Sequence, residues 1–308
     1  MKLNHIYQGD VVDKLQDLDN DSVQCVVTSP PYWGLRDYGV DNQLGLEETP
    51  EKYVKNLVNV FREVKRVLKD DGTVWLNLGD SYNTSPSGNK FWSNGVGSNK
   101  YYKDKKIHQK EKRNFGTIKN KDLVGIPWRV AFALQADGWY LRQDIIWHKP
   151  NPMPESVKDR CTKAHEYIFL LTKSSKYFYD ADAIAEKTIT KDNVNRDRDT
   201  TRLNNTPGRT KMNGLKTNNY ETRNKRSVWK INTKPYKEAH FAVFPEELPT
   251  LCIKAGSKEG DVVLDPFFGS GTTGWVSQRL GRAWIGIELN PEYIKIAEKR
   301  FIQQDLFV

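Results

Sequence analysis

The sequence of 308 residues predicts an α/β fold built on a doubly wound, mostly parallel sheet. Three observations lead to this prediction. Short apolar runs alternate with helical patterns along most of the chain, the order expected of parallel strands joined by crossover helices. One such run, at 22–29, stops at two prolines. Another, at 260–267, leads into a glycine-rich turn that a helix follows.

Each element follows from a local pattern. Residues 22–29 (SVQCVVTS) are short, apolar and rich in β-branched side chains, which is typical of a strand buried in a parallel sheet. From Glu51 to Lys69 apolar residues recur every three or four positions, which predicts an amphipathic helix that ends at the Asp-Asp-Gly of 70–72. The elements expected after it are, in order, a strand at 73–80, a helix at 130–140, strands at 143–149 and 165–173, a strand at 260–267, a helix at 272–281, a strand at 282–289 and a helix at 291–303.

Two segments interrupt this alternation. Residues 83–120 are rich in Asn, Gly, Ser, Lys and Tyr, and we expect a long mobile insertion there. Residues 186–236 are basic and poor in apolar side chains. Between Glu186 and Lys237 the chain has 14 Lys or Arg and 5 Asp or Glu, whereas the remainder is balanced at 34 of each sign. This excess favours a polyanionic partner for the segment, and a solvated loop is the alternative.

Composition excludes several other classes of protein. No apolar stretch approaches the roughly 20 residues that a membrane span needs, and the first ten residues lack the apolar region of a signal peptide. The three cysteines lie far apart without a CxxC pair, which argues against zinc sites and disulfides. We therefore expect a cytoplasmic protein with no metal site and no membrane partner.

The glycine-rich turn at 269–274 matches the pattern GxGxxG, and Glu288 follows 19 residues after its first glycine. A dinucleotide such as NAD is one reading of that pattern. However, Asp265 and two phenylalanines separate the strand from the first glycine, and these residues suit S-adenosylmethionine better. Asp265 would face its ammonium group, Gly269 and Gly271 would allow a close approach, and Glu288 would accept the ribose hydroxyls. Aromatic faces such as that of Phe267 attract a sulfonium.

The prolines after the strand at 22–29 would then face the same ligand. Ligands of a doubly wound sheet lie outside the carboxyl ends of its strands, so the two loops meet if their strands are neighbours. The amine of a nucleobase is a weak nucleophile because its lone pair is delocalised. The Ser29 side chain and the Pro30 carbonyl could accept its hydrogens, with Pro31 fixing the loop, and Tyr32 could stack on a flipped base.

These segments together resemble an amino-group-specific DNA methyltransferase of the permuted β arrangement, in which the catalytic tetrapeptide precedes the target-recognition region and the cofactor loop comes last. The resemblance covers nearly the whole chain except 83–120 and 186–236. The segments that carry it are IYQGDVVDKL at 6–15, VVTSPPYW at 26–33, GWYLRQDIIWHKPNPMP at 138–154, HFAVFPEELPTLCIKAG at 240–256 and LDPFFGSGTT at 264–273.

The resemblance implies a Rossmann-like fold for S-adenosylmethionine-dependent methyl transfer, with an inserted target-recognition region. Residues 1–185 would form the catalytic part, 186–236 the recognition region, and 237–308 the cofactor-binding part of the same domain. The catalytic residues implied are Ser29, Pro30, Pro31 and Tyr32. The cofactor-binding residues implied are Asp10, which contacts the adenine, together with Phe244, Asp265, Phe267, Gly269, Ser270, Gly271, Thr272 and Glu288.

The resemblance further implies double-stranded DNA as the partner and transfer to cytosine N4 or adenine N6. Adenine enzymes usually carry Asp or Asn in place of Ser29, so cytosine N4 is favoured. Transfer to the C5 of cytosine is disfavoured, because that chemistry needs a Pro-Cys pair that the sequence lacks.

Several alternatives stay open. They are a methyltransferase for RNA or protein, a DNA-binding protein without catalysis, a monomer or a homodimer, and a separate restriction endonuclease as a second partner.

Overall fold

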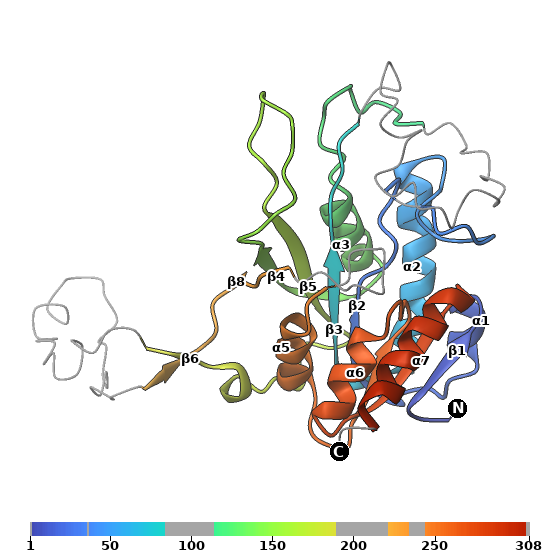
Figure 1. The fold of residues 1–308 in the computed structure, drawn as a ribbon, viewed down its shortest axis with the longest axis vertical. Coiled ribbons are helices and arrows are strands. Elements are labelled where there is room, and N and C mark those ends of the chain that lie inside the picture. The colour runs from blue at the N-terminus through green and yellow to red at the C-terminus, as the bar shows by residue number, and fades with distance from the viewer. Residues whose placement is uncertain (1, 36, 84–113, 189–220, 234–243, 306–308) are drawn as a thin grey trace, which may run out of the picture. The chain divides into compact units, whose positions relative to one another are not determined.

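The computed structural model describes residues 2–35, 37–83, 114–188, 221–233 and 244–305 (Figure 1). These residues form two compact units. The larger unit comprises Met1–Asp180 and Ser227–Val308, and the smaller unit comprises Ala181–Arg226. Within the described residues, no helix is long and apolar enough to cross a membrane.

The larger unit is built on a sheet whose described strands follow the order β1-β10-β9-β2-β3-β5-β4-β8. All neighbouring strands are parallel except where β5 pairs with β3 and with β4, so β5 is the reversed strand. The fold class is therefore confirmed. The strands are β1 (His5–Gln8), β2 (Val23–Thr28), β3 (Leu68–Leu78), β4 (Tyr140–His148), β5 (His165–Thr172), β8 (Val228–Lys230), β9 (Val262–Asp265) and β10 (Ala283–Glu288).

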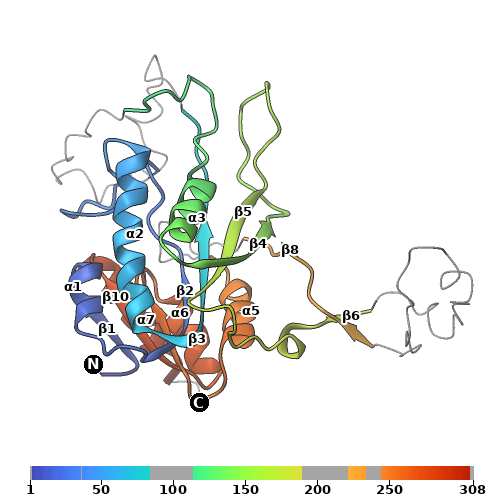
Figure 2. The same ribbon diagram turned by 180° about the vertical axis from the view of Figure 1, so that it is seen from behind.

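Helices cover both faces of this sheet. In Figures 1 and 2, α1, α2 and α3 lie on one face and α5, α6 and α7 on the other. Contacts run from α1 to α2 and from α2 to α3, and on the opposite face from α5 to α6 and from α6 to α7. The bounds are α1 (Val11–Gln16), α2 (Pro50–Val67), α3 (Ile126–Ala136), α5 (Glu247–Gly256), α6 (Thr272–Arg279) and α7 (Pro291–Asp305).

Helix α2 illustrates how a local pattern becomes core. Thr49 caps its first turn by accepting from the backbone N–H of Lys52 at 3.2 Å, and Pro50 follows as a suitable first residue. Its apolar stripe is buried against the sheet, with Leu57, Phe61 and the neighbouring core side chains fully enclosed. Burial of a side chain of this size contributes about 1.5–3 kcal/mol.

The end of α2 differs from the prediction. The helix ends at Val67, and β3 begins at Leu68 and runs through the Asp-Asp-Gly of 70–72. Val23 pairs with Leu68, whereas Cys25 pairs with Thr73, so the register between β2 and β3 shifts there. A Cβ at Gly72 would lie 2.7 Å from the Leu68 side chain, which shows why this irregular stretch contains a glycine.

The predicted insertion at 83–120 is described only at its two ends, and residues 84–113 lie outside the described residues. Its C-terminal end is held by the core. The Phe115 ring lies 5.2 Å from that of Trp33 in an edge-on contact, and Asn83 Nδ2 donates to the Ile118 carbonyl at 2.7 Å. Phe115 and Ile118, within the predicted insertion, therefore contact Trp33 and Asn83.

The smaller unit contains a short 3₁₀ helix (Asp182–Ile184) and the antiparallel strands β6 (Glu186–Lys187) and β7 (Thr222–Arg223). Glu186 pairs with Arg223 at 3.4 Å and with Arg226 at 3.1 Å. Residues 189–220 of the predicted recognition region lie outside the described residues. Residues 227–233, at its end, belong to the larger unit, where β8 extends the main sheet.

Candidate functional site

Neighbouring parallel strands end at one edge of the sheet, and the predicted site residues follow them. Glu288 ends β10 and is paired in register with Gln8 at the end of β1, two residues before Asp10. Asp265 ends β9 beside Gly286. Ser29 follows β2, which pairs directly with β9. The sheet therefore brings the glycine-rich turn and the proline loop together, as expected from the sequence.

Asp265 joins three elements at this edge. Its Oδ1 accepts from Thr28 Oγ1 at 2.6 Å and from the Phe267 N–H at 3.0 Å, and its Oδ2 accepts from Thr273 Oγ1 at 2.7 Å. Burial raises the pKa of Asp265 to about 6, and the bonds from Thr28 and Thr273 act in the opposite direction. Residues of β2 and α6 therefore hold the two oxygens of the carboxylate in place.

Glu288 and Asp10 also contact backbone donors. Glu288 Oε2 accepts from the Gly269 N–H at 2.7 Å and Oε1 from the Asn290 N–H at 2.8 Å, and burial raises the pKa of this carboxyl group. Asp10 caps α1 by accepting from the N–H of Val12 at 2.8 Å. Glu288 therefore holds the glycine-rich turn in place, while Asp10 lies at the neighbouring strand.

The two predicted glycines of the turn differ in what surrounds them. A Cβ at Gly269 would meet, among the described residues, the Phe267 carbonyl oxygen at 4.0 Å, so this side of the turn has room for a ligand. A Cβ at Gly271 would lie 3.1 Å from both Ala297 and Phe268. Gly269 (φ +52°) and Gly271 (φ +79°) both adopt the left-handed conformation that favours glycine, and only at Gly271, just before α6, does packing also limit a side chain.

The remaining predicted cofactor residues occupy varied surroundings. Ser270 Oγ is buried and has no hydrogen-bond partner among the described residues, which makes it a donor and acceptor available to a ligand. Thr272 is buried, and its Oγ1 accepts from Arg300 at 3.0 Å. Phe267 is half-buried, whereas Phe268 stacks on Trp284 in the core. Phe244 is half-buried before α5.

The open side of Gly269, the unpartnered Ser270 hydroxyl and the two carboxylates fit a ligand with an ammonium group and a ribose. The buried Asp265 carboxylate at the end of β9 would repel a pyrophosphate, so that group is less well matched. These residues therefore favour S-adenosylmethionine over NAD.

The proline loop after β2 is held firmly. Pro30 is buried, and Ser29, Pro31 and Tyr32 are half-buried. The Pro31 carbonyl accepts from Tyr53 Oη of α2 at 2.8 Å. The Tyr32 ring packs against Gly79, where a Cβ would lie 2.6 Å from Tyr32 Cε2. Its hydroxyl contacts Asn77 and Glu166, so the ring is held at both ends.

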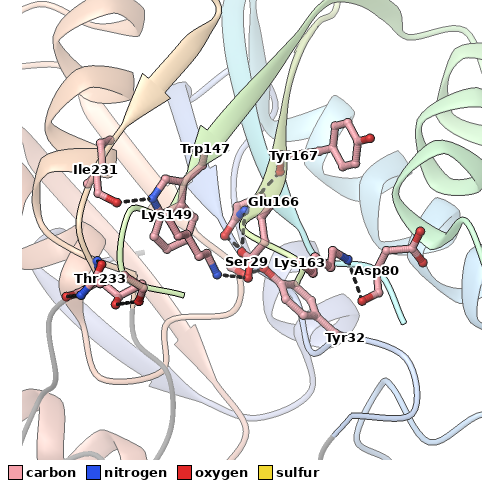
Figure 3. A network of polar contacts seen from close by, with 12 residues as sticks. Ser29, Tyr32, Asp80, Trp147, Lys149, Lys163, Glu166, Tyr167, Ile231 and Thr233 are labelled. Atoms are coloured by element: carbon pink, nitrogen blue, oxygen red, sulfur yellow. Dashed lines mark hydrogen bonds and ion pairs between the residues drawn. The ribbon is translucent and has the colours of Figure 1, made fainter. Parts of the chain in front are cut away.

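Sequence reasoning did not assign two residues that contact Tyr32, or the lysine that pairs with one of them. Glu166 Oε2 lies 2.9 Å from Tyr32 Oη, as Figure 3 shows. Asn77 Oδ1 lies 3.1 Å from the same Tyr32 oxygen. The Glu166 carboxylate also pairs with the Lys149 ammonium, and both side chains are mostly buried. Lys149 follows β4, and Glu166 lies at the start of the reversed strand β5, which brings both to this edge.

The sequence contains little indication that Lys149 and Glu166 belong to the site, and a clearer one for Asp80. A buried charged pair cannot be recognised from a strand pattern, because the register between β4 and β5 decides which charges meet. Asp80, after β3, follows a clearer rule: its carboxylate accepts from the N–H groups of Gly125 and Ile126 at the start of α3. An acid at the end of a strand, as at Asp80, was a recognisable candidate.

Cys25 lies within β2, and burial raises the pKa of its thiol to about 12. Its thiolate is therefore scarce at neutral pH, and this cysteine is unsuited to act as a nucleophile.

Comparisons with known proteins point in one direction. A family model described as DNA methylase matches residues 23–299. The chain is 49% identical over 300 residues to the type II methyltransferase M.Cfr9I of Citrobacter freundii, covering 97% of this chain and 88% of that protein. It is also 49% identical over 299 residues to the type II methyltransferase M.SmaI of Serratia marcescens, covering 97% of this chain and 91% of that protein.

Two solved structures share the fold. The PvuII DNA methyltransferase (cytosine-N4-specific) matches with a TM-score of 0.63 at 20% identity, covering 96% of this chain and 85% of that chain. A Thermus thermophilus protein, described as a putative DNA modification methylase and complexed with S-adenosyl-L-methionine, matches with a TM-score of 0.60 at 24% identity, covering 97% of this chain and 93% of that chain.

Proposed function

Because this chain belongs to the DNA methylase family, we propose that it transfers a methyl group from S-adenosylmethionine to the exocyclic amine of a base flipped out of double-stranded DNA, with cytosine N4 as the target. One observation carries this proposal. The proline loop and the glycine-rich turn follow paired strands, and Thr28 Oγ1 binds Asp265 Oδ1 at 2.6 Å directly between them. An amine held at the loop would therefore lie beside a methyl donor held at the turn.

The loop would prepare the amine for attack. S-adenosylmethionine would supply a methyl group on a sulfonium, whose carbon–sulfur bond breaks as the nitrogen–carbon bond forms, with S-adenosylhomocysteine as the leaving group. Ser29 Oγ and the Pro30 carbonyl would accept the two amine hydrogens, drawing the nitrogen toward tetrahedral geometry as it gains the methyl group. The nitrogen then loses one proton to solvent. The prolines and the Tyr53 contact to the Pro31 carbonyl hold these acceptors in place, so little reorganisation is needed.

The turn and its neighbours would hold the donor. Asp265 pairs with the ammonium group, directly or through water, Glu288 accepts from the ribose hydroxyls, and Asp10 contacts the adenine. The unpartnered Ser270 hydroxyl and the open side of Gly269 support this placement. Phe244, Phe267, Gly271 and Thr272 complete the proposed cofactor set.

Cytosine N4 is favoured because the Thr-Ser-Pro-Pro-Tyr form at 28–32 resembles cytosine-N4 enzymes, whereas adenine enzymes usually carry Asp or Asn at position 29. Adenine N6 is the alternative, because both reactions use the same donor and geometry. We assign target recognition to the basic region 186–236, whose charge suits phosphate contacts. Since both relatives are named type II methyltransferases, we extend the proposal to a partner restriction endonuclease.

The proposal is tested by incubating the protein with labelled S-adenosylmethionine and unmethylated genomic DNA, followed by digestion to nucleosides and mass spectrometry. We expect N4-methylcytosine. If N6-methyladenine is found instead, the target is adenine N6, and the proposed donor and catalytic loop still hold. DNA without a methylated base would contradict the proposal.

Donor affinity should depend on pH through Asp265. Its pKa of about 6 in the folded chain exceeds its ordinary value of 3.8, so burial favours the neutral carboxyl group. The ammonium of the donor needs the ionised form. Affinity should therefore rise as pH increases through 6, and at pH 5 it should be about tenfold weaker than at pH 7.

Isothermal titration calorimetry between pH 5 and 7.5 would measure this dependence. The Glu288→Gln variant should keep the transition near pH 6, and Asp265→Asn should lose it. Equal affinity at pH 5 and pH 7 in the wild type would contradict an ionised Asp265 in the site. Without the donor, the contribution of Asp265 to folding stability should decrease as pH rises from about 4 to about 6, since the folded state binds the proton more tightly.

Gly79→Ala should impair turnover through Tyr32. The added methyl group would lie 2.6 Å from Tyr32 Cε2, so the ring must move. We expect kcat to fall on the order of tenfold while donor affinity stays unchanged, because a small displacement of the loop misplaces its acceptors. Single-turnover rates and calorimetry would measure the two effects. Gly72→Ala is a matched control, since its methyl group would lie 2.7 Å from the Leu68 side chain toward the other end of β3, and it should leave kcat unchanged. An unchanged kcat for Gly79→Ala would rule out this steric role.

A further inference from the structure

The hydrogen bonds of the Tyr32 hydroxyl have a definite direction. Tyr32 Oη lies 2.9 Å from Glu166 Oε2 and 3.1 Å from Asn77 Oδ1. Neither a carboxylate oxygen nor an amide carbonyl oxygen can donate, so the single phenolic proton serves these two acceptors. Ser29 Oγ lies 3.2 Å from the same Tyr32 oxygen. Because that oxygen has no second proton, Ser29 must be the donor in this contact.

Neighbouring groups keep the chain in this direction. Burial and the Glu166 charge raise the pKa of Tyr32 well above its ordinary value, so the phenol keeps its proton at neutral pH. Asn77 Nδ2 donates to the Tyr167 carbonyl at 3.1 Å and to Glu166 Oε2 at 3.2 Å, which turns the Asn77 oxygen toward Tyr32. Lys149 holds the other carboxylate oxygen, Glu166 Oε1.

We propose that Glu166 is a positioning residue, whose carboxylate directs the hydrogen-bond chain from Ser29 to Tyr32 so that the Ser29 proton points away from the target base. This inference rests on the proposed function. The lone pairs of Ser29 Oγ then face the base, and Ser29 acts as an acceptor. An exocyclic amine, which donates, is accepted there. A carbonyl at the same position of the ring, as in uracil, would place a second acceptor against Ser29 Oγ, so a base with that carbonyl binds more weakly.

Glu166→Gln tests the direction of this chain with almost no change in shape. The Lys149 ammonium requires an acceptor, so it orients the amide oxygen of the new side chain toward itself and the NH₂ group toward Tyr32. Tyr32 would then accept from residue 166. The NH₂ group of residue 166 would also face Asn77 Nδ2, so the Asn77 amide should turn and present its own NH₂ to Tyr32 in place of its oxygen. With neither acceptor left, the Tyr32 proton turns toward Ser29, which becomes a donor to the base. We expect kcat to fall on the order of 10- to 100-fold, somewhat less than the loss of a direct transition-state contact.

A double-mutant cycle with Tyr32→Phe separates this role from a general loss of structure. If Glu166 acts through the phenol, Glu166→Gln should lower kcat much less in the Tyr32→Phe background than in the wild type. Lys149→Met removes the group that orients the amide, so Glu166→Gln should also cost less in that background. Glu51→Gln, which changes an exposed acid paired with Arg129, is the matched control and should leave kcat unchanged. An equal decrease of kcat in all backgrounds would overturn the proposal.

The preference for an amine over a carbonyl on the target base should change only if Glu166 sets the hydrogen-bond direction, and not if Glu166 merely supports the structure. Methylated sites are first mapped with the wild type, and duplexes are made with the target cytosine replaced by uracil, or with hypoxanthine if the target is adenine. Because a mismatched base flips more easily in either protein, the two proteins are compared with each other. The ratio of affinity for the amine form to affinity for the carbonyl form should be roughly tenfold lower in Glu166→Gln than in the wild type. An unchanged ratio would contradict the assigned direction.

Failure of the proposed function can be told apart from failure of the inference about Glu166. If the wild type transfers no methyl group to DNA, the function is wrong, and the hydrogen-bond chain is then tested by the ¹³Cζ resonance of labelled Tyr32. Glu166→Gln should shift this resonance because the phenol changes from donor to acceptor at residue 166. An unmoved resonance would overturn the inference about Glu166 independently of activity.

Discussion

Replacing Asp265 with Ala should abolish detectable donor binding, with affinity at least about 100-fold weaker, because removal of one partner of a buried charge pair is strongly unfavourable. The same change leaves Thr28 Oγ1, Thr273 Oγ1 and the Phe267 N–H without their acceptor. Each buried donor left unsatisfied costs about 1–3 kcal/mol, so the melting temperature should also fall. Calorimetry with S-adenosylmethionine and thermal unfolding would measure the two effects.

Two further variants make this result interpretable. Asp265→Asn keeps the shape of the side chain and one acceptor oxygen, so it should fold more stably than the alanine variant yet still bind the donor poorly. Asp261→Ala is the matched control. Asp261 directly precedes β9, at the end of the strand away from the site, and accepts from the Lys258 N–H at 2.8 Å. This variant should leave donor affinity unchanged. Donor affinity retained by Asp265→Ala would remove Asp265 from the cofactor site.

Replacing Pro31 with Ala should leave donor binding intact and lower turnover on the order of 100-fold, a loss comparable to that of one preorganised transition-state contact. The backbone carbonyl that accepts from Tyr53 Oη remains, so the loop keeps this anchor. The fixed φ of the proline is lost, and the Pro30 carbonyl beside it no longer has a preorganised direction toward the amine. Single-turnover methylation of DNA and calorimetry with the donor would separate the two effects.

Pro127→Ala is the matched control, because Pro127 lies in the first turn of α3, where proline is favourable for a reason unrelated to the site. It should leave both donor affinity and turnover near the wild-type values. Undiminished methylation by Pro31→Ala would refute the assignment of the catalytic loop.

Much of the fold was predictable because its signals are local. The spacing of apolar residues over 51–69 depends on one helix face, and the helix was observed at Pro50–Val67. The strand and helix on either side of the glycine-rich turn were also predicted, since turn chemistry and β-branched runs act over a few residues. The end of α2 was misplaced because pairing of β3 with β2 continues the chain as a strand through a sequence that by itself resembles a helix stop.

Some features of the candidate site were likewise recognisable from the sequence, whereas others depend on tertiary contacts. Ser29, Asp265 and Glu288 were recognisable because each lies at the end of an apolar run, and parallel strands bring their carboxyl ends to one edge. Gly271 was recognisable from the turn pattern, whereas its packing against Phe268, Ala297 and Phe301 depends on contacts that no local pattern reveals.

The sequence by itself determined the alternation of elements, the residues at the strand ends and the family, because periodicity, turn residues and motif order are properties of neighbouring positions. Only the tertiary structure decided that Glu166 meets Tyr32, 134 positions away along the chain, and that Lys149 holds the other oxygen of its carboxylate. The physical reason is that hydrogen-bond direction depends on which donors and acceptors lie within about 3 Å of one another, and the reversed strand β5 sets that proximity.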